Sequence, residues 1–175
     1  DGRYSGDATG GAGDCDFVGG LGDGPDVGAG NVAGWFATGV AGLSIEDSTG
    51  RDEAPLYEKM LAVGRVRAAR AAIDDSGIPV LLTGRCEAFL VEAEEPLRVV
   101  LDRLVAYAEA GADCLYAPGV TEPHEITAIV RAVAPKPVNV LVTGFNAQVS
   151  QRQLADLGVR RISVGSGFAL AAWGA

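Results

Sequence analysis

The chain has 175 residues, of which 48% are apolar and 21% are charged, and it carries a net charge of −9. Length and composition are typical of one soluble globular domain. The negative charge argues against nucleic acid or an anionic membrane as partner, because both require a basic face. The longest apolar stretches are far shorter than the ~20 residues of a membrane span, and no signal-peptide pattern is present.

The cysteines indicate the redox environment. There are three of them, Cys15, Cys86 and Cys114, and no two form a CxxC pair. An odd number of widely spaced cysteines indicates reduced thiols in a cytoplasmic protein, and not a disulfide framework or a zinc site.

The first 40 residues differ in composition from the rest, since 15 of the 25 glycines lie in residues 1–50. Residues 1–13 contain no apolar run, so we expect an irregular segment there. Residues 25–38 stand where a helix would precede a strand, but each of their glycines would cost about 1 kcal/mol relative to alanine in a helix interior. This second stretch is therefore predicted to be a weak helix or a loop.

From residue 40 onward, short apolar runs alternate with amphipathic segments. The segment 96–110 is the clearest example, because its apolar residues recur at helical spacing and Gly111 stands where a left-handed residue ends a helix. We predict parallel strands at 40–46, 79–85, 113–117, 137–142 and 160–165, and helices near 55–73, 96–110, 122–133 and 151–157. This alternation defines the α/β class.

Charged side chains gather where the predicted strands end. Asp14 and Asp16 are two residues apart, so in an extended segment their carboxylates face the same way, and Glu46 ends the next strand. Converging carboxylates suit a hard divalent ion such as Mg²⁺. Taken singly, each has an ordinary structural explanation, as a turn residue or a helix cap.

The following strand ends in a second charged pair, Arg85 and Glu87. A guanidinium at this position can bind a substrate carboxylate or phosphonate through two hydrogen bonds. Cys86 lies between them and should point to the opposite face, as a buried structural thiol.

Two further motifs have simpler explanations. His124 lies in a segment that resembles a helix start, with Thr121 as the N-cap and a proline in the first turn. Gly165-Ser166-Gly167 resembles a phosphate-binding turn at a helix N-terminus, but a tight turn between strand and helix explains it equally well. We expect a structural role for His124.

Six segments in the same order along the chain resemble the isocitrate lyase/phosphoenolpyruvate mutase superfamily. They are GVAGLSIEDSTG, PLYEKMLAVGRVRAARAA, PVLLTGRCEAFL, YAEAGADCLYAPGV, KPVNVL and LGVRRISVGSGFALAAWGA. The resemblance begins near Asp14 and implies a (β/α)8 barrel of the TIM type. It also implies Mg²⁺-dependent cleavage or formation of C–C or P–C bonds in small 2-oxo or 2-hydroxy acids through an enolate, with Mn²⁺ as the alternative ion.

The resemblance assigns roles to the strand-end residues. The superfamily's DxD motif resembles Asp14-Cys-Asp16, and its ED motif resembles Glu46-Asp47. Asp14, Asp16 and Glu46 would bind the metal, Glu46 and Arg85 would be catalytic, and Arg85 and Glu87 would bind the substrate. Mg²⁺ and an arginine would together stabilise the negative charge of an enolate.

The chain also departs from the superfamily pattern. Isocitrate and methylisocitrate lyases have a Lys-Lys/Arg-Cys-Gly-His loop where this chain has Ser48-Thr-Gly-Arg-Asp-Glu53, so those two activities are not expected. Two strands and two helices precede the DxD motif in the superfamily and are absent here. We therefore expect about six of eight β/α units in residues 14–175, as in a fragment, a misassigned gene start or a decayed copy.

Three functions follow as hypotheses. The first is a Mg²⁺-dependent lyase or hydrolase acting on a small oxo acid. The second is a phosphonate-forming mutase, although residues 47–56 do not match the substrate-gating loop of the mutases. The third is a truncated, non-catalytic homologue. For the full-length form we expect a small carboxylic acid as substrate and a homo-oligomer.

Overall fold

The computed structural model describes residues 14–17, 40–142 and 149–174. They form a parallel sheet of six strands in the order β1-β2-β3-β4-β5-β6. The strands are β1 Asp14–Phe17, β2 Gly42–Glu46, β3 Leu81–Arg85, β4 Cys114–Tyr116, β5 Val138–Leu141 and β6 Arg161–Ser163. The helices are α2 Lys59–Ser76, α3 Pro96–Glu109, α4 Pro123–Val133, α5 Gln151–Asp156 and α6 Gly167–Trp173.

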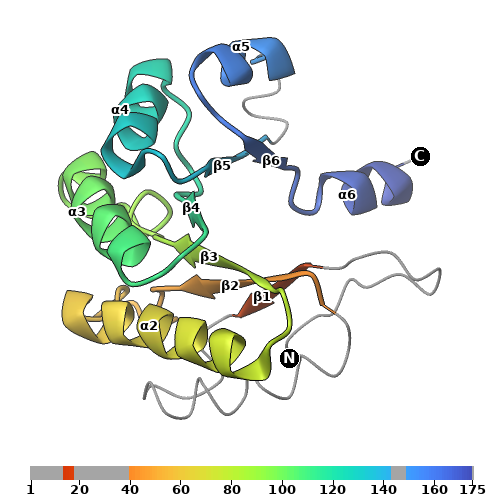
Figure 1. The fold of residues 1–175 in the computed structure, drawn as a ribbon. Helices are drawn as coiled ribbons and strands as arrows, with labels where there is room; N and C mark the ends of the chain where they lie inside the picture. Colours follow the sequence, from red (N-terminus) through yellow and green to blue (C-terminus); the bar gives the residue numbers. More distant parts are fainter. Residues whose placement is uncertain (1–13, 18–39, 143–148, 175) are drawn as a thin grey trace.

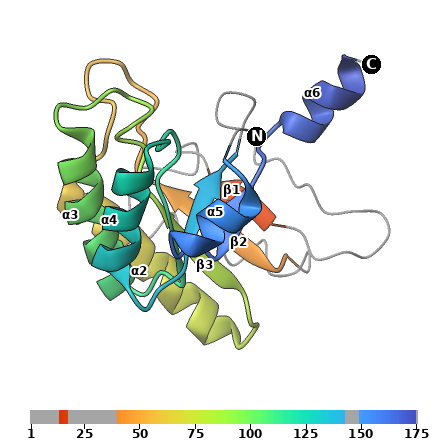
Figure 2. The ribbon, with the colours of Figure 1, turned by 90° about the horizontal axis from the view of Figure 1, so that it is seen from above.

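The sheet is an arc with helices on its outer side. Helices α2 to α5 follow one another around the strands, whereas α6 extends away from the sheet in both views (Figures 1 and 2). Each strand pairs with its neighbour in the sequence, and within the described residues β1 and β6 each have one partner strand. The parallel α/β architecture is thus confirmed, and the six strands of the described residues form an open arc.

The two faces of the sheet differ in chemistry because successive side chains of a strand alternate between them. The helix-facing side chains, among them Leu43, Leu82 and Leu115, are fully buried in the apolar core. The opposite, inner face of the arc carries buried polar residues, including Ser44, Thr83 and Asn139. The inner face is therefore the polar one.

Local signals explain most element ends. Gly111 and Gly158 have φ values of 107° and 95° and follow the last turns of α3 and α5, as predicted for Gly111. Ser150 and Gln153 form the capping box that opens α5. Helix α2 begins later than expected, because the Glu58 side chain caps it by accepting the Leu61 N–H at 3.1 Å.

The start of α4 corrects one expectation. The N-cap is Glu122 and not Thr121, and Glu122 makes no side-chain capping hydrogen bond. Pro123 occupies the first helical position, where its missing N–H costs nothing. The proline thus sets the helix start one residue later than the N-cap preference of threonine suggested.

Some expectations lie outside the described residues. These are the irregular segment 1–13 and the weak helix or loop at 25–38. No helix within the described ranges is both long and apolar enough to cross a membrane.

Candidate active site

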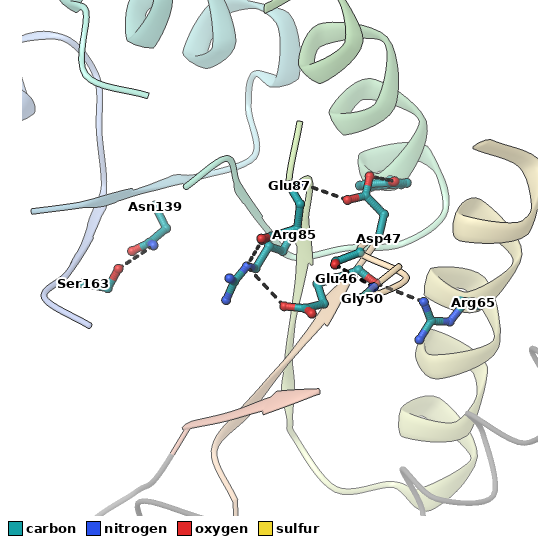
Figure 3. Close-up of polar contacts among 10 residues, drawn as sticks. Glu46, Asp47, Gly50, Arg65, Arg85, Glu87, Asn139 and Ser163 are labelled. Atoms are coloured by element: carbon teal, nitrogen blue, oxygen red, sulfur yellow. Dashed lines mark hydrogen bonds and ion pairs between the residues drawn. The ribbon is translucent and has the colours of Figure 1, made fainter. Parts of the chain in front are cut away.

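Arg85 lies between two carboxylates at the ends of β2 and β3. Its Nε hydrogen-bonds to Oε1 of Glu87 and lies 3.6 Å from Oε2 of Glu46 (Figure 3). The parallel register pairs Glu46 directly with Arg85, so the two side chains leave neighbouring strands at the same level. The predicted convergence of Glu46 and Arg85 is therefore observed, and Glu87 joins them.

Burial makes these contacts strong. Glu46 and Glu87 are each 6% exposed, and the Arg85 guanidinium packs 5.3 Å from the centre of the Tyr116 ring. Burial would lower the pKa of Arg85, but the hydrogen bond to Glu87 and the charges of Glu87 and Glu46 outweigh it and raise the pKa. Arg85 is consequently a permanent, oriented cation.

The acidic motif at the start of the described chain lies within a strand and not at its end. Strand β1 begins at Asp14, and the register places Asp14 beside Gly42 and Asp16 beside Ser44. Asp16 is therefore level with Ser44, which precedes Glu46 by two residues on the neighbouring strand and faces the same side of the sheet. Among the side chains that the structure describes, no three potential ligands are grouped closely enough to hold a metal ion.

A cavity of about 320 Å³ opens beside Arg85 on the inner face of the arc. It is lined by Ser44, Arg85, Leu90, Tyr116, Pro118, Asn139, Leu141, Arg161, Ser163 and Gly165. The Nδ2 of Asn139 donates to the Ser163 hydroxyl at 2.9 Å, which links β5 to β6 (Figure 3). A cavity of this size and polarity suits a small polar molecule.

Sequence reasoning did not identify most of this lining. Tyr116, Asn139, Arg161 and Ser163 each stand at inner-facing positions of short strands. The available signal is a polar or aromatic residue at alternate positions of an otherwise apolar run. Such a residue is recognisable only once the inner face is known.

The other singled-out motifs have structural roles. Cys86 is fully buried in the helix-facing core, as predicted, and burial together with the charge of Asp47 raises the pKa of its thiol well above the usual value. His124 is exposed in the first turn of α4. Gly165 lines the cavity with φ of 53°, which a tight turn into α6 explains.

Fold and site together define a β/α-barrel type of protein with a charged cluster at its strand ends. Residues 14–175 match the family described as phosphoenolpyruvate phosphomutase, and the chain belongs to this family. The family is part of the phosphoenolpyruvate mutase/isocitrate lyase superfamily of lyases and mutases, which confirms the resemblance stated above.

Three relatives illustrate the similarity. A Burkholderia cenocepacia J2315 protein, provisionally described as a lyase or mutase, is 43% identical with a TM-score of 0.87, covering 92% of this chain and 57% of its own. An oxaloacetate decarboxylase of Pseudomonas fluorescens SBW25 is 33% identical over 77% of this chain and 46% of its own length. A solved oxaloacetate acetylhydrolase in complex with oxalate is 25% identical with a TM-score of 0.79, covering 92% of this chain and 55% of its own.

The chain is shorter than these proteins. It spans about half the length of the curated relatives it matches, 53% in one case and 46% in another. The open arc of six strands agrees with this partial coverage.

Proposed function

We propose that the full-length protein is a Mg²⁺-dependent lyase or hydrolase that cleaves a C–C bond of a small 2-oxo or 2-hydroxy acid through an enolate. The observation that carries this proposal is Arg85, a buried cation held between Glu46 and Glu87 at the edge of a small polar cavity. The oxaloacetate decarboxylase and oxaloacetate acetylhydrolase relatives support a lyase-type reaction.

Each residue has a distinct role in this proposal. Arg85 binds the substrate carboxylate and stabilises the enolate charge that develops when the C–C bond breaks. Glu87 accepts a hydrogen bond from Nε of Arg85, and this bond fixes the orientation of the guanidinium plane. Glu46 acts at the reacting centre together with Arg85, because its carboxylate lies beside the same Nε.

The donor set fits a hard divalent cation. Glu46 supplies a carboxylate at the end of β2, and the register brings Asp14 and Asp16 to the adjoining strand. Oxygen ligands of this kind, completed by water, are those that Mg²⁺ prefers. Asp14, Asp16 and Glu46 would hold the ion, which supplies positive charge for the enolate.

A metabolite panel tests the reaction. The full-length protein should turn over at least one small oxo or hydroxy acid with Mg²⁺ or Mn²⁺ and lose that activity in EDTA. Arms with oxaloacetate, substituted malates and other C–C substrates separate decarboxylase, hydrolase and lyase activity by their products. Turnover that is unaffected by EDTA would contradict the metal role.

The alternative is a phosphonate-forming phosphomutase, since the matching family bears that description. Phosphorus NMR of the protein with phosphonopyruvate or phosphoenolpyruvate distinguishes it, because only a mutase interconverts a P–C and a P–O bond. A protein inactive in both assays, yet folded, would be the non-catalytic homologue.

The setting of the protein is part of the proposal. We place it in the cytoplasm as a homo-oligomer that acts on a small carboxylic acid and binds neither nucleic acid nor membrane, in keeping with its net charge of −9. Sedimentation of the full-length protein tests the assembly state.

A further inference from the structure

Asp47 directly follows Glu46 in the sequence, but its side chain points the other way, toward α3 (Figure 3). It is 1% exposed. Its Oδ1 accepts the backbone N–H of Glu87 at 2.8 Å. Its Oδ2 accepts the Tyr107 hydroxyl at 2.7 Å and Nη1 of Arg103 at 3.1 Å. One carboxylate thus joins the end of β2, the end of β3 and helix α3.

The same contacts fix the segment that follows β2. Arg103 also donates from Nη2 to the Tyr57 carbonyl at 2.8 Å, and the Tyr57 N–H donates to the Asp47 carbonyl at 2.8 Å. Both ends of the segment 48–56 are therefore held at one point.

Helix α2 supplies a second support from the same side. Arg65, 7% exposed, donates from Nη1 to the Glu46 carbonyl at 3.1 Å. Its guanidinium lies 4.4 Å from the centre of the Tyr57 ring. The backbone of Glu46 is thus held by α2, while the backbone of Glu87 is held by Asp47.

Stability alone explains this arrangement poorly. Burying an aspartate and an arginine costs desolvation energy that their attraction barely offsets, and apolar residues of similar size are often at least as stable. The charged arrangement differs from an apolar one in that its hydrogen bonds are directional. Each of them fixes the position of one atom at a strand end.

We propose that Asp47 is a positioning residue, which sets the spacing of Glu46 and Glu87 on either side of Arg85 by tying their strand ends to each other and to α3. The catalytic consequence rests on the proposed function; the geometric one does not. Removal of the Asp47 carboxylate breaks the link between the Glu87 backbone and α3, and with it the support of the carboxylate that orients Arg85.

The state of Tyr107 agrees with this role. Burial, followed by the charge of Asp47, raises the pKa of Tyr107 far above its ordinary value of 10.0. The hydroxyl is therefore protonated and available as a donor throughout the range in which enzymes are assayed.

The chain offers a matched control at the opposite end of β3. Asp113 also accepts one backbone N–H, that of Leu82 at 2.9 Å, and one arginine, Nη1 of Arg70 at 2.9 Å. Asp47→Asn turns one of two accepting oxygens into an N–H donor, so the side chain can no longer accept from the Glu87 N–H and from Tyr107 and Arg103 at once. Asp113→Asn removes a charge at the other end of the strand but keeps an oxygen for both donors, because Leu82 and Arg70 share its Oδ2. Both should lower the urea midpoint of unfolding, but only the first lies beside Arg85.

The test is proton exchange at the Arg85 Nε–H, followed by NMR on the full-length protein and assigned by its loss in Arg85→Lys. Asp47→Asn should speed this exchange by about tenfold, the factor that corresponds to one lost hydrogen bond, whereas Asp113→Asn should not change it. Equal exchange in wild type and Asp47→Asn overturns the proposal. Equal acceleration of the exchange by Asp47→Asn and Asp113→Asn also overturns the proposal, because the effect would then come from a general loss of stability and not from the position of Asp47.

A milder variant covers the case in which Asp47→Asn does not fold. Tyr107→Phe removes the 2.7 Å hydrogen bond to Oδ2 and the weaker 3.4 Å hydrogen bond that Arg103 donates to the hydroxyl. The contact of Arg103 with Asp47 stays in place, so this variant should speed the exchange by about threefold. No change in this variant, with Asp47→Asn unfolded, counts against the proposal.

Activity gives the second readout. On the acid that the wild type turns over, Asp47→Asn should lower kcat/KM by about 10- to 100-fold, as expected for small misplacement of a catalytic group, with Asp113→Asn unchanged. If the wild type turns over no acid, the proposed function fails while the exchange result stands. If exchange responds and kcat/KM does not, Asp47 positions Arg85 without consequence for catalysis and the catalytic part of the proposal is wrong.

Discussion

Nε of Arg85 lies 3.6 Å from Oε2 of Glu46 and is hydrogen-bonded at the same time to Glu87. Two carboxylates thus share one cation, and the formal charge of the three groups is negative. A cluster of this kind does not attract an anion by itself. It becomes attractive to a carboxylate substrate only when a divalent cation adds its charge.

The first prediction follows from this balance of charge. Oxalate, the ligand seen with the oxaloacetate acetylhydrolase relative, should bind the full-length protein in calorimetry only when Mg²⁺ or Mn²⁺ is present. Asp14→Asn should weaken the metal affinity. Tight oxalate binding in EDTA would contradict this prediction, because it would show that the arginines lining the cavity, Arg85 and Arg161, hold the anion without a metal ion.

The second prediction concerns Arg85 itself. Arg85→Ala should raise KM and lower kcat by about 100-fold, because the same group binds the substrate and stabilises the enolate. Arg85→Lys should recover only part of this, since lysine keeps the charge but not the planar fork. The control is Arg98→Ala, which removes an exposed arginine paired with Glu95 at 2.9 Å on the outer helix α3. An unchanged kcat/KM in Arg85→Ala removes Arg85 from the site.

The strand-end residues could be predicted because two simple patterns coincide. The apolar runs ending at Glu46 and Arg85 have the period and length of parallel strands, and parallel strands bring their carboxyl ends to one edge. The sequence therefore locates this pair without any knowledge of the helices.

The supports behind this pair could not be predicted in the same way. Arg65 and Arg103 lie in amphipathic helices, where a charged residue ordinarily belongs to the solvated face. The structure buries Arg65 and leaves the Arg103 side chain 12% exposed, because each reaches a strand end from the helix layer. Only the packing of helix on sheet brings Asp47 and Arg103 together across 56 residues of sequence.

The third prediction tests the turn after α5. Gly158 has φ of 95°, and a Cβ there would lie 2.7 Å from Cγ1 of Val130. Gly158→Ala should therefore lower the free energy of unfolding by about 2–4 kcal/mol through strain and overlap together. Gly77→Ala is the matched control, since Gly77 has φ of 66° but open space around it, and it should cost only about 1 kcal/mol.

A compensating substitution separates the two causes in Gly158→Ala. Val130→Ala removes the methyl group that the new Cβ meets, so the double variant should be less destabilised than the sum of the single variants. Strict additivity in urea unfolding would assign the whole effect to backbone strain.

The last prediction concerns alkaline pH. Burial and the charge of Asp47 raise the pKa of the Cys86 thiol well above 9.0 and that of Tyr107 far above 10.0. In the unfolded chain these groups lose their protons at about pH 8.5 and about pH 10. Above each value the folded state binds more protons than the unfolded state, so the free energy of unfolding must fall as pH rises, by up to about 1.4 kcal/mol per pH unit for each group.

Urea unfolding followed from neutral pH into the alkaline range measures this loss. Tyr107→Phe should be less stable than the wild type at neutral pH, because it lacks the hydrogen bond to Asp47, but its stability should fall less steeply above pH ~10. Cys86→Ala should flatten the earlier part of the curve, above pH ~8.5. The control is Thr127→Val, which removes an exposed hydroxyl that donates to the Pro123 carbonyl at 2.8 Å and does not titrate, so its curve should run parallel to that of the wild type. A Tyr107→Phe curve parallel to the wild type would show that this hydroxyl ionises as readily in the folded protein as in the unfolded chain, and that neither burial nor the charge of Asp47 keeps it protonated.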